Sequence, residues 1–276
     1  MLNKRQQSIL AFINEQGEAR NSDLLELCGD CSSMTLWRDL TALEREGLII
    51  RFRGGAASTS STPDGGGREI NFIRRIKQNT VEKDDVATIA AELIVSDQSY
   101  YLDAGSTIFT LLSHIRPGSY NFITSATNIA AELASHPNFD VTMLGGQVNS
   151  NTLSCSGPQA EAMLSAINID IAVMATSGYT SGTGFTSGKL AEAEVKKKVI
   201  EKSVFTIMLL DHDKLRRRHP FTFASLSDVD IVIGDAALPE EFGKLCKETG
   251  TTLFTPNDGL TADERRAIMS DLLNNK

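Results

Sequence analysis

Cysteine is scarce in this sequence, and long apolar runs are absent. The four cysteines are spread over 276 residues, and only Cys28 and Cys31 lie close together. A zinc site of the usual kind needs a second close pair of ligands, so we interpret all four, Cys155 and Cys246 included, as free thiols and predict no metal. No window approaches the roughly 18 uninterrupted apolar residues that a membrane helix needs.

The chain also lacks a secretory signal and an excess of positive charge. It begins Met1-Leu2-Asn3-Lys4-Arg5 and runs directly into a helical pattern, which predicts a cytoplasmic location. The formal net charge is −8, and the first 53 residues hold seven basic and eight acidic residues. This balance argues against indiscriminate coating of nucleic acid, so a DNA site must depend on where individual basic side chains point.

A length of 276 residues favours a small module followed by a larger domain. Apolar residues recur at helical spacing from Lys4 to Gln16, and Gly17 ends that run. A second short helix follows Asn21, its expected N-cap, and Gly29 closes it. After a tight turn, Ser32 is expected to cap a third helix. This order is typical of a helix-turn-helix.

The third helix of this module has one apolar face. Leu36, Leu40 and Leu43 stand at positions i, i+4 and i+7, so we expect them to face the core and to turn Arg38 toward solvent. Residues near the N-terminus of such a helix reach base edges in the major groove. The candidate DNA contacts on it are Ser33, Thr35, Trp37 and Arg38, and Arg38 is the leading one.

Residues 48–55, Leu-Ile-Ile-Arg-Phe-Arg-Gly-Gly, begin as a β pattern and end in glycines, which is typical of a two-stranded wing. Arg51 and Arg53 alternate onto one face, where they would contact DNA phosphates. For either arginine alone, a solvated surface charge is the alternative. We assign residues 1–57 to a winged helix-turn-helix domain.

The composition then changes. Between Gly54 and Gly67 the chain is mostly Ser, Thr and Gly, which indicates a flexible linker. Helical character returns from Arg68 to Lys83, where the basic cluster Arg74, Arg75 and Lys77 would touch either phosphate or the second domain. Residues 58–83 are therefore interpreted as a linker and connecting helix, and residues 84–276 as the second domain.

The second domain alternates β runs with helical patterns, which predicts an α/β fold with a mostly parallel sheet. In such sheets, ligands bind at the carboxyl ends of the strands. The expected strands are Tyr100–Asp103, Asn121–Thr124, Val141–Leu144, Ile169–Ala175, Val204–Asp211 and Val229–Gly234.

Small and hydroxyl-bearing residues follow three of these strands, and such loops at helix starts can hold a phosphate or a sugar. Ammonium groups further along the chain would neutralise a phosphate, although Lys196, within a run of lysines, has an exposed position as its alternative. The candidate effector-binding residues are Asp103, Ala104, Gly105, Ser106, Thr107, Thr124, Ser125, Gly145, Gly146, Gly178, Glu194, Lys196 and Lys214.

Both halves resemble the DeoR family of bacterial transcription regulators. The resemblance is carried by residues 32–40 with Gly54-Gly55, by Asp103-Ala104-Gly105-Ser106-Thr107, by Leu144-Gly145-Gly146, by Glu192-Ala193-Glu194-Val195-Lys196 and by Asp211-His212-Asp213-Lys214. The sequence departs from the family pattern at Leu36, Trp37, Arg53, Ser125 and His212. The resemblance implies a sensor domain similar to ribose-5-phosphate isomerases that binds a phosphorylated sugar or a related metabolite.

We therefore expect a DNA-binding regulator, a repressor of a sugar-metabolism operon, that binds its operator as a homo-oligomer and whose DNA affinity changes with a sugar phosphate. An effector that favours the DNA-binding form would instead act as a co-repressor. The alternative is a sugar-phosphate isomerase-like enzyme with an appended DNA-binding module. The resembling enzymes carry carboxylates after the strand that corresponds to Ile169–Ala175, whereas this chain has Thr176-Ser177-Gly178-Tyr179-Thr180. We accordingly expect no enzyme and no cofactor.

Overall fold

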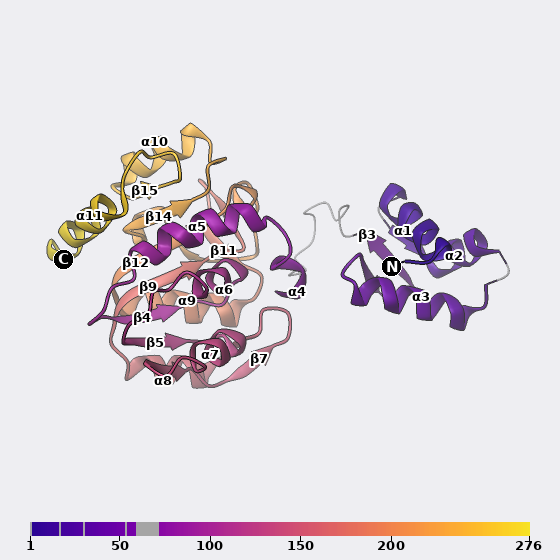
Figure 1. Ribbon diagram of the computed structural model, residues 1–276, viewed down its shortest axis with the longest axis horizontal. Coiled ribbons are helices and arrows are strands. Elements are labelled where there is room, and N and C mark those ends of the chain that lie inside the picture. Colours follow the sequence, from indigo (N-terminus) through magenta and orange to yellow (C-terminus); the bar gives the residue numbers. More distant parts are fainter. Residues whose placement is uncertain (1, 17, 30, 53, 59–71) are drawn as a thin grey trace. The chain divides into compact units, whose positions relative to one another are not determined.

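The computed structural model describes residues 2–16, 18–29, 31–52, 54–58 and 72–276. The chain divides into two compact units, residues 1–66 and residues 67–276, and each is described by itself (Figure 1). The predicted DNA contact Arg53 and most of the predicted linker lie outside the described residues.

The first unit is a winged helix-turn-helix, as predicted. Its helices are α1 (Lys4–Gln16), α2 (Asn21–Cys28) and α3 (Ser33–Arg45), and its strands are β1 (Glu18–Arg20), β2 (Ile49–Phe52) and β3 (Gly55–Ser58). The strands pair antiparallel in the order β1-β3-β2, so the predicted wing gains a third strand. Part of the stretch predicted as linker, from Gly55 to Ser58, is therefore a strand.

Two helix starts were predicted in this unit, and one of them was wrong. The Ser32 hydroxyl accepts a hydrogen bond from the backbone N–H of Thr35 at 3.2 Å, which confirms Ser32 as the N-cap of α3. Asn21 lies inside α2, and Arg20 is the capping residue instead. The Asp23 carboxylate accepts the backbone N–H of Arg20 at 3.2 Å, so an acidic side chain inside the helix satisfies this donor.

The second unit is built on a seven-stranded sheet in the order β15-β14-β12-β9-β4-β5-β6, and every neighbouring pair is parallel. The predicted fold class is thus confirmed. The sheet strands are β4 (Ser99–Leu102), β5 (Tyr120–Thr124), β6 (Phe139–Met143), β9 (Ile169–Ala175), β12 (Ser203–Leu210), β14 (Ile231–Gly234) and β15 (Thr252–Phe254).

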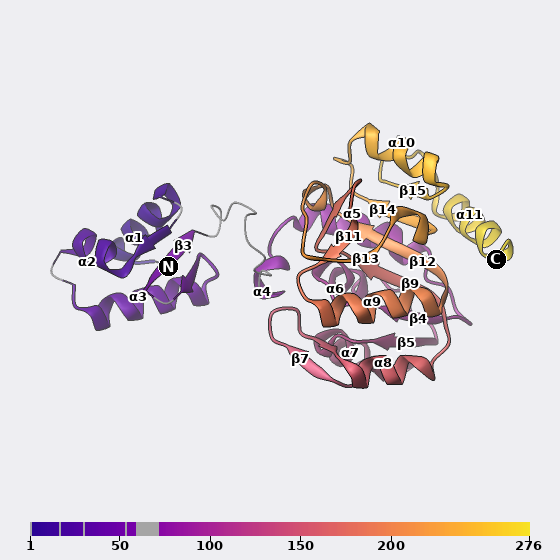
Figure 2. The same ribbon diagram turned by 180° about the vertical axis from the view of Figure 1, so that it is seen from behind.

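Helices cover both faces of this sheet. One face carries α5 (Thr80–Glu92), α6 (Ser106–Leu112), α7 (Thr127–Leu133) and α11 (Ala262–Asn274), while the other carries α8 (Pro158–Ser165), α9 (Leu190–Lys202) and α10 (Glu240–Thr249) (Figures 1 and 2). Along β9, Ile171 and Val173 pack into the first core, and Ala172 and Met174 pack into the second. Because both faces are buried, the central strands read as continuous apolar runs.

Smaller elements surround the sheet. A short helix, α4 (Phe72–Arg75), precedes α5, and a hairpin is formed by β7 (Gln147–Asn149) and β8 (Ser154–Ser156). A second small sheet contains β10 (Gly178–Thr180), β11 (Gly184–Ser187) and β13 (Phe221–Ala224). Two 3-10 turns, η1 (His212–Lys214) and η2 (Leu226–Asp228), follow β12 and β13.

The strand order reverses between β4 and β9. From β4 the chain adds β5 and β6 on one side, then returns to place β9 on the other side of β4. Loops that leave two adjacent strands in opposite directions open a crevice at their carboxyl ends, which is where open α/β sheets bind ligands. The fold therefore predicts a site between the residues that follow β4 and β9.

Candidate functional site

The exposed face of α3 carries the candidate contacts to DNA. Leu36, Leu40 and Leu43 are buried, as expected, with relative exposures of at most 2%. Trp37 is 53% exposed, and Arg38 and Ser33 are also exposed. Thr35 is half-buried, and its backbone N–H and its hydroxyl both bond to Ser32. The helix thus presents the ring of Trp37 beside the exposed side chain of Arg38.

Arg51, on β2 of the wing, packs against α3. Its guanidinium lies over the Trp37 ring, 5.4 Å from the centroid, and Nη1 donates to the Thr41 hydroxyl at 2.7 Å. Thr41 in turn donates to the carbonyl of Trp37 at 2.7 Å. The wing and α3 are therefore connected through Arg51, which extends the exposed face of α3 instead of projecting away from it.

A pocket lies at the strand-order reversal of the second unit. It encloses about 560 Å³ of empty space, including the part open to solvent, and its walls come from segments far apart in the sequence. The lining residues are Arg75, Asp103, Ala104, Gly105, Ser106, Thr107, Ser125, Thr152, Ser154, Cys155, Ala175, Thr176, Ser177, Glu192, Val195, Lys196 and Lys214.

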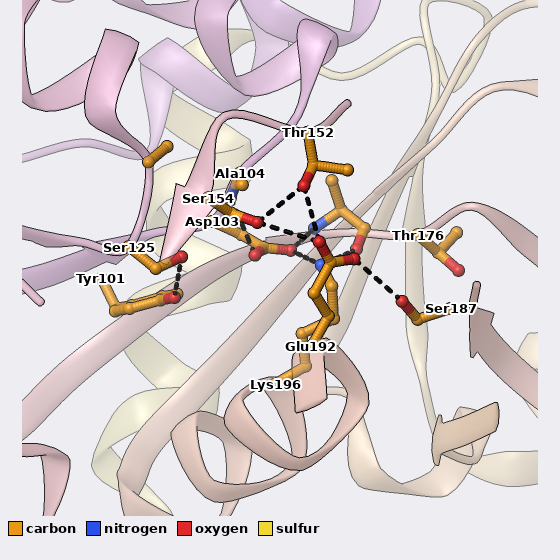
Figure 3. Close-up of polar contacts among 12 residues, drawn as sticks. Tyr101, Asp103, Ala104, Ser125, Thr152, Ser154, Thr176, Ser187, Glu192 and Lys196 are labelled. Carbon is orange, nitrogen blue, oxygen red and sulfur yellow. Dashed lines mark hydrogen bonds and ion pairs between the residues drawn. The ribbon is translucent and has the colours of Figure 1, made fainter. Parts of the chain in front are cut away.

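Asp103 and Lys196 form a buried ion pair in this pocket (Figure 3). Asp103 follows β4 directly, and its carboxylate accepts the backbone N–H groups of Ala104 at 2.8 Å and of Ala175 at 2.9 Å. Lys196 Nζ donates to Asp103 Oδ2 and to the Ala175 carbonyl, the latter at 2.9 Å. Asp103 thereby joins β4, β9 and α9 at the point where the strand order reverses.

Glu192 lies one helical turn before Lys196 and is 6% exposed (Figure 3). Its Oε1 accepts hydrogen bonds from Asn149 at 2.7 Å, from Thr152 at 2.6 Å and from Ser154 at 3.0 Å. Burial works to raise the pKa of Glu192, but the bonds from Thr152 and Asn149 and the charge of Lys196 outweigh it and leave the pKa below its ordinary value. Glu192 is therefore a buried, charged carboxylate held by the β7–β8 hairpin.

Cations gather at another part of the pocket. Arg75 and Lys214 line it, and Lys83 lies behind them, with its Nζ donating to the carbonyls of Arg75 and Gln78. Burial, and next the positive charge of Lys214, lower the pKa of Lys83 to about 8. Burial also lowers the pKa of Lys214, although Asp211, whose Oδ2 lies 3.9 Å from Lys214 Nζ, opposes this. The positive charges of Arg75 and Lys214 both work to lower the pKa of Lys83, so a bound anion would offset repulsion among these cations.

The pocket contains part of the predicted effector site. Among the predicted residues, Asp103, Ala104, Gly105, Ser106, Thr107, Ser125, Lys196 and Lys214 line it. Lys196 is thus buried and not the exposed member of a lysine run. Thr124 is fully buried under the loop, where its hydroxyl accepts the backbone N–H of Ala126 at 3.0 Å. Gly145, Gly146 and Gly178 are not among the lining residues.

Glu194 does not reach the pocket, since it is exposed on α9, and Glu192 occupies that place instead. The helical spacing of the apolar residues could have predicted this. Val195 and Val199 are buried, and Glu192 precedes Val195 by three residues on the same face of α9. Thr152 and Ser154 were also missed. Arg75 was predicted only as a member of a basic cluster that touches phosphate or the second domain, and it lies in the second unit and lines the pocket. These residues come from a four-residue helix and a hairpin, and nothing local in the sequence brings them to the sheet.

Three further observations concern metal binding, membrane spanning and the residues after β9. Among the described residues, no group of three or more His, Cys, Asp or Glu side chains is placed to hold a metal ion. Within the same residues, no helix is long and apolar enough to cross a membrane. After β9, the Thr176 hydroxyl donates to the Gly178 carbonyl at 2.8 Å, and the nearby Asp103 carboxylate is paired with Lys196.

A winged helix-turn-helix followed by an α/β domain with a polar pocket defines a DNA-binding transcription regulator. The model of the DeoR-like helix-turn-helix domain matches residues 5–62, and that of the DeoR C terminal sensor domain matches residues 78–236. The chain belongs to the DeoR family of transcription regulators and is a regulator, not an enzyme.

Individual proteins agree with this family. The HTH-type transcriptional regulator GlpR of Haloferax volcanii is 30% identical over 80% of this chain and 86% of its own length. The glycerol-3-phosphate regulon repressor of Escherichia coli is 28% identical over 86% of this chain and 92% of its own length. Among solved structures, ribose 5-phosphate isomerase A of Methanocaldococcus jannaschii aligns with 16% identity and a TM-score of 0.39, over 51% of this chain and 56% of that one.

Proposed function

We propose that this regulator binds operator DNA through α3 and the wing, and that a phosphorylated sugar or related polyol in the sensor pocket changes its DNA affinity. It acts in the cytoplasm as a homo-oligomer, and in the absence of the effector it represses a sugar-metabolism operon. The observation that carries the proposal is that two oppositely charged groups of residues line one pocket. We call Glu192 with Thr152 and Ser154 the carboxylate part, and Arg75 with Lys214 the cationic part.

The two parts suit the two chemical ends of a sugar phosphate. Glu192, with the hydroxyls of Thr152 and Ser154, forms a network of acceptors and donors that can exchange hydrogen bonds with sugar hydroxyls. Arg75 and Lys214 supply positive charge for a phosphate, and the Ser106 and Thr107 side chains add hydroxyl donors from the start of α6. A neutral sugar would bring no negative charge to these cations.

The DNA-binding part of the proposal depends on Arg38 and Trp37. Both side chains are exposed on the outer face of α3, and the three leucines behind them fix that orientation. An arginine at this place can form a bidentate contact with a guanine, and an apolar ring can contact a thymine methyl group. Arg51 supports Trp37 from the wing.

The name of one relative supports repression as the effect of DNA binding on transcription. The Escherichia coli relative is named as a repressor of a glycerol-3-phosphate regulon. With repression as the starting state, an effector that weakens DNA binding acts as an inducer, and one that strengthens it acts as a co-repressor. The sign of the change in DNA affinity distinguishes these two outcomes.

Replacing Arg38 tests the DNA-binding part. The Arg38→Ala variant should lose roughly 1 to 3 kcal/mol of specific affinity for operator DNA if Arg38 reads a base. The matched control is Arg116→Ala, which removes another exposed arginine, from the sensor unit, and should leave the affinity unchanged. Electrophoretic mobility shift on the region upstream of its own gene measures both. Equal affinity for the two variants would remove Arg38 from the contacts.

A thermal-shift screen tests the sensor part. Phosphorylated sugars and polyols of three to six carbons are each compared with the same compound without phosphate. A ligand at about 100 times its dissociation constant stabilises the folded protein by about 2.7 kcal/mol. We expect at least one phosphorylated compound to raise the melting temperature and its unphosphorylated form to have no effect. Stabilisation by the unphosphorylated forms alone would contradict a phosphate-binding pocket.

A further inference from the structure

The wall of the pocket includes a residue from α4, the first described helix after the wing of the DNA-binding unit (Figure 1). That residue is Arg75, the last of this four-residue helix. The other lining residues come from the end of β9, the loops at the sheet edge, the start of α6, the β7–β8 hairpin, α9 and η1. The chain that arrives from the DNA-binding unit therefore contributes directly to the ligand site.

The start of α4 is attached to the carboxylate part of the pocket. The backbone N–H of Phe72 donates to the carbonyl of Asn151 at 2.7 Å. The next residue, Thr152, donates its hydroxyl to Glu192 at 2.6 Å. Phe72 is 6% exposed, and its ring packs edge-on against Phe109 of α6 at a centroid distance of 5.6 Å. The hydrogen bond holds α4 to the hairpin that bonds Glu192, and the ring contact holds it to α6.

The turn that follows α4 is attached to the cationic part. Lys83 Nζ donates to the carbonyls of Arg75 and Gln78, and the Asn79 amide donates to Asp213 Oδ2 at 2.6 Å. Asp213 precedes Lys214, which lines the pocket. Residues 72–79 therefore connect the two chemically different parts of the pocket, and Arg75 stands between these attachments.

We propose that Arg75 binds the anionic group of the effector and that α4 is the element through which occupancy of the pocket reaches the DNA-binding unit. This inference rests on the proposed function, and it names both a ligand contact and the route of regulation. An anion beside Arg75 and Lys214 offsets the repulsion among the cations, so it favours one placement of α4. A bound ligand then shifts the populations of the conformations that α4 and the chain leading into the sensor unit adopt.

Two substitutions separate binding from transmission. Arg75→Ala removes the proposed contact with the anion, and Arg75→Lys keeps the charge but loses the planar guanidinium. Phe72→Ala removes the packing of α4 on Phe109, and Phe72 does not line the pocket. Lys77→Ala is the matched control, since Lys77 is an exposed cation two residues after Arg75.

The full-length variants are tested with inorganic phosphate and with the phosphorylated compound that stabilises the wild type most. We expect Arg75→Ala to weaken binding of both probes at least tenfold in isothermal titration calorimetry, Arg75→Lys to weaken it less, and Lys77→Ala to stay within twofold. We expect Phe72→Ala to bind the phosphorylated compound within threefold of the wild type and yet to lose its effect on DNA affinity. Hydrogen exchange should show that the ligand protects amides of residues 72–79 in the wild type.

The outcomes distinguish the inference from the proposed function. If a phosphorylated compound changes the DNA affinity of the wild type, and the Arg75 and Phe72 variants respond equally well, the inference is overturned and the function stands. If the wild type binds inorganic phosphate through Arg75 but responds to no phosphorylated sugar or polyol, the proposed function fails and only the anion contact survives. A wild type that binds neither probe overturns both.

Discussion

Trp37 is the only tryptophan of the chain, and it lies on the face of α3 that we assign to DNA. Its ring is 53% exposed and is covered on one side by the guanidinium of Arg51. If operator DNA binds against Trp37, it displaces water from the ring, and the tryptophan fluorescence should change. We expect the emission to shift in wavelength or intensity on titration with operator DNA and to saturate with the binding curve. Unchanged emission at saturating DNA would place Trp37 outside the interface.

Glu192 should stabilise the sensor unit in a pH-dependent way. Its folded-state pKa lies below the ordinary value of 4.5, so its contribution is present above that value and is lost as the pH falls through the folded-state pKa. At pH 7 we expect Glu192→Gln to cost roughly 1 to 3 kcal/mol, because an amide nitrogen then meets groups that donate to the carboxylate. The difference from the wild type should shrink below pH 4.5.

Denaturant unfolding of the full chain, followed by circular dichroism at pH 7 and in acid, measures this effect. The matched control is Glu194→Gln, two residues further along α9 and exposed, which should change stability by less than about 0.5 kcal/mol at either pH. A cost for Glu192→Gln that is equal at both pH values would contradict the charged state that we assign to this carboxylate.

At the scale of elements, the wing depends on a glycine at a close approach. A Cβ on Gly55 would lie 2.3 Å from the carbonyl oxygen of Ala19 on β1 and 2.7 Å from the Phe52 ring. Gly55→Ala must therefore separate β3 from β1, at a cost of roughly 1 to 3 kcal/mol. We expect a lower denaturation midpoint when unfolding is followed by Trp37 fluorescence. Gly182→Ala, where a Cβ meets nothing within 4 Å, is the control, and equal midpoints would refute the close approach.

Element by element, the sequence predicts the regular parts of the fold well. The strand expected at Ile169–Ala175 is found with those bounds, and the one expected at Val204–Asp211 is shifted by one residue to Ser203–Leu210. Buried parallel strands are long apolar runs, so composition alone marks them. The edge strand β15, with three residues, and the β7–β8 hairpin carry no such run and were missed.

The site was only partly predictable because its residues depend on phase and on distant packing. The loop from Asp103 to Thr107 follows a central strand, so its place at the carboxyl edge of the sheet follows from the fold class. To predict that Glu192 and not Glu194 lines the pocket, one must know which face of α9 is buried. The buried residues Val195 and Val199 define that face. Arg75 and Ser154 reach the pocket only through tertiary contacts, and a linear pattern does not contain those.

At the scale of the whole molecule, the proposed function links DNA binding by α3 to a phosphorylated ligand in the pocket. The pocket draws on residues from Arg75 to Lys214, so a bound ligand would contact segments that lie far apart in the sequence. A ligand changes DNA affinity only by the difference in its affinity for the DNA-bound and free forms. Typical coupling free energies of about 1 to 3 kcal/mol correspond to changes of roughly 5- to 150-fold.

The most direct test is a titration of operator DNA with the full-length protein at fixed salt, with and without the phosphorylated compound that stabilises it most. We predict a change in DNA affinity of at least fivefold, with no change for the unphosphorylated compound. The same DNA affinity at saturating concentrations of every phosphorylated compound in the screen would contradict the account.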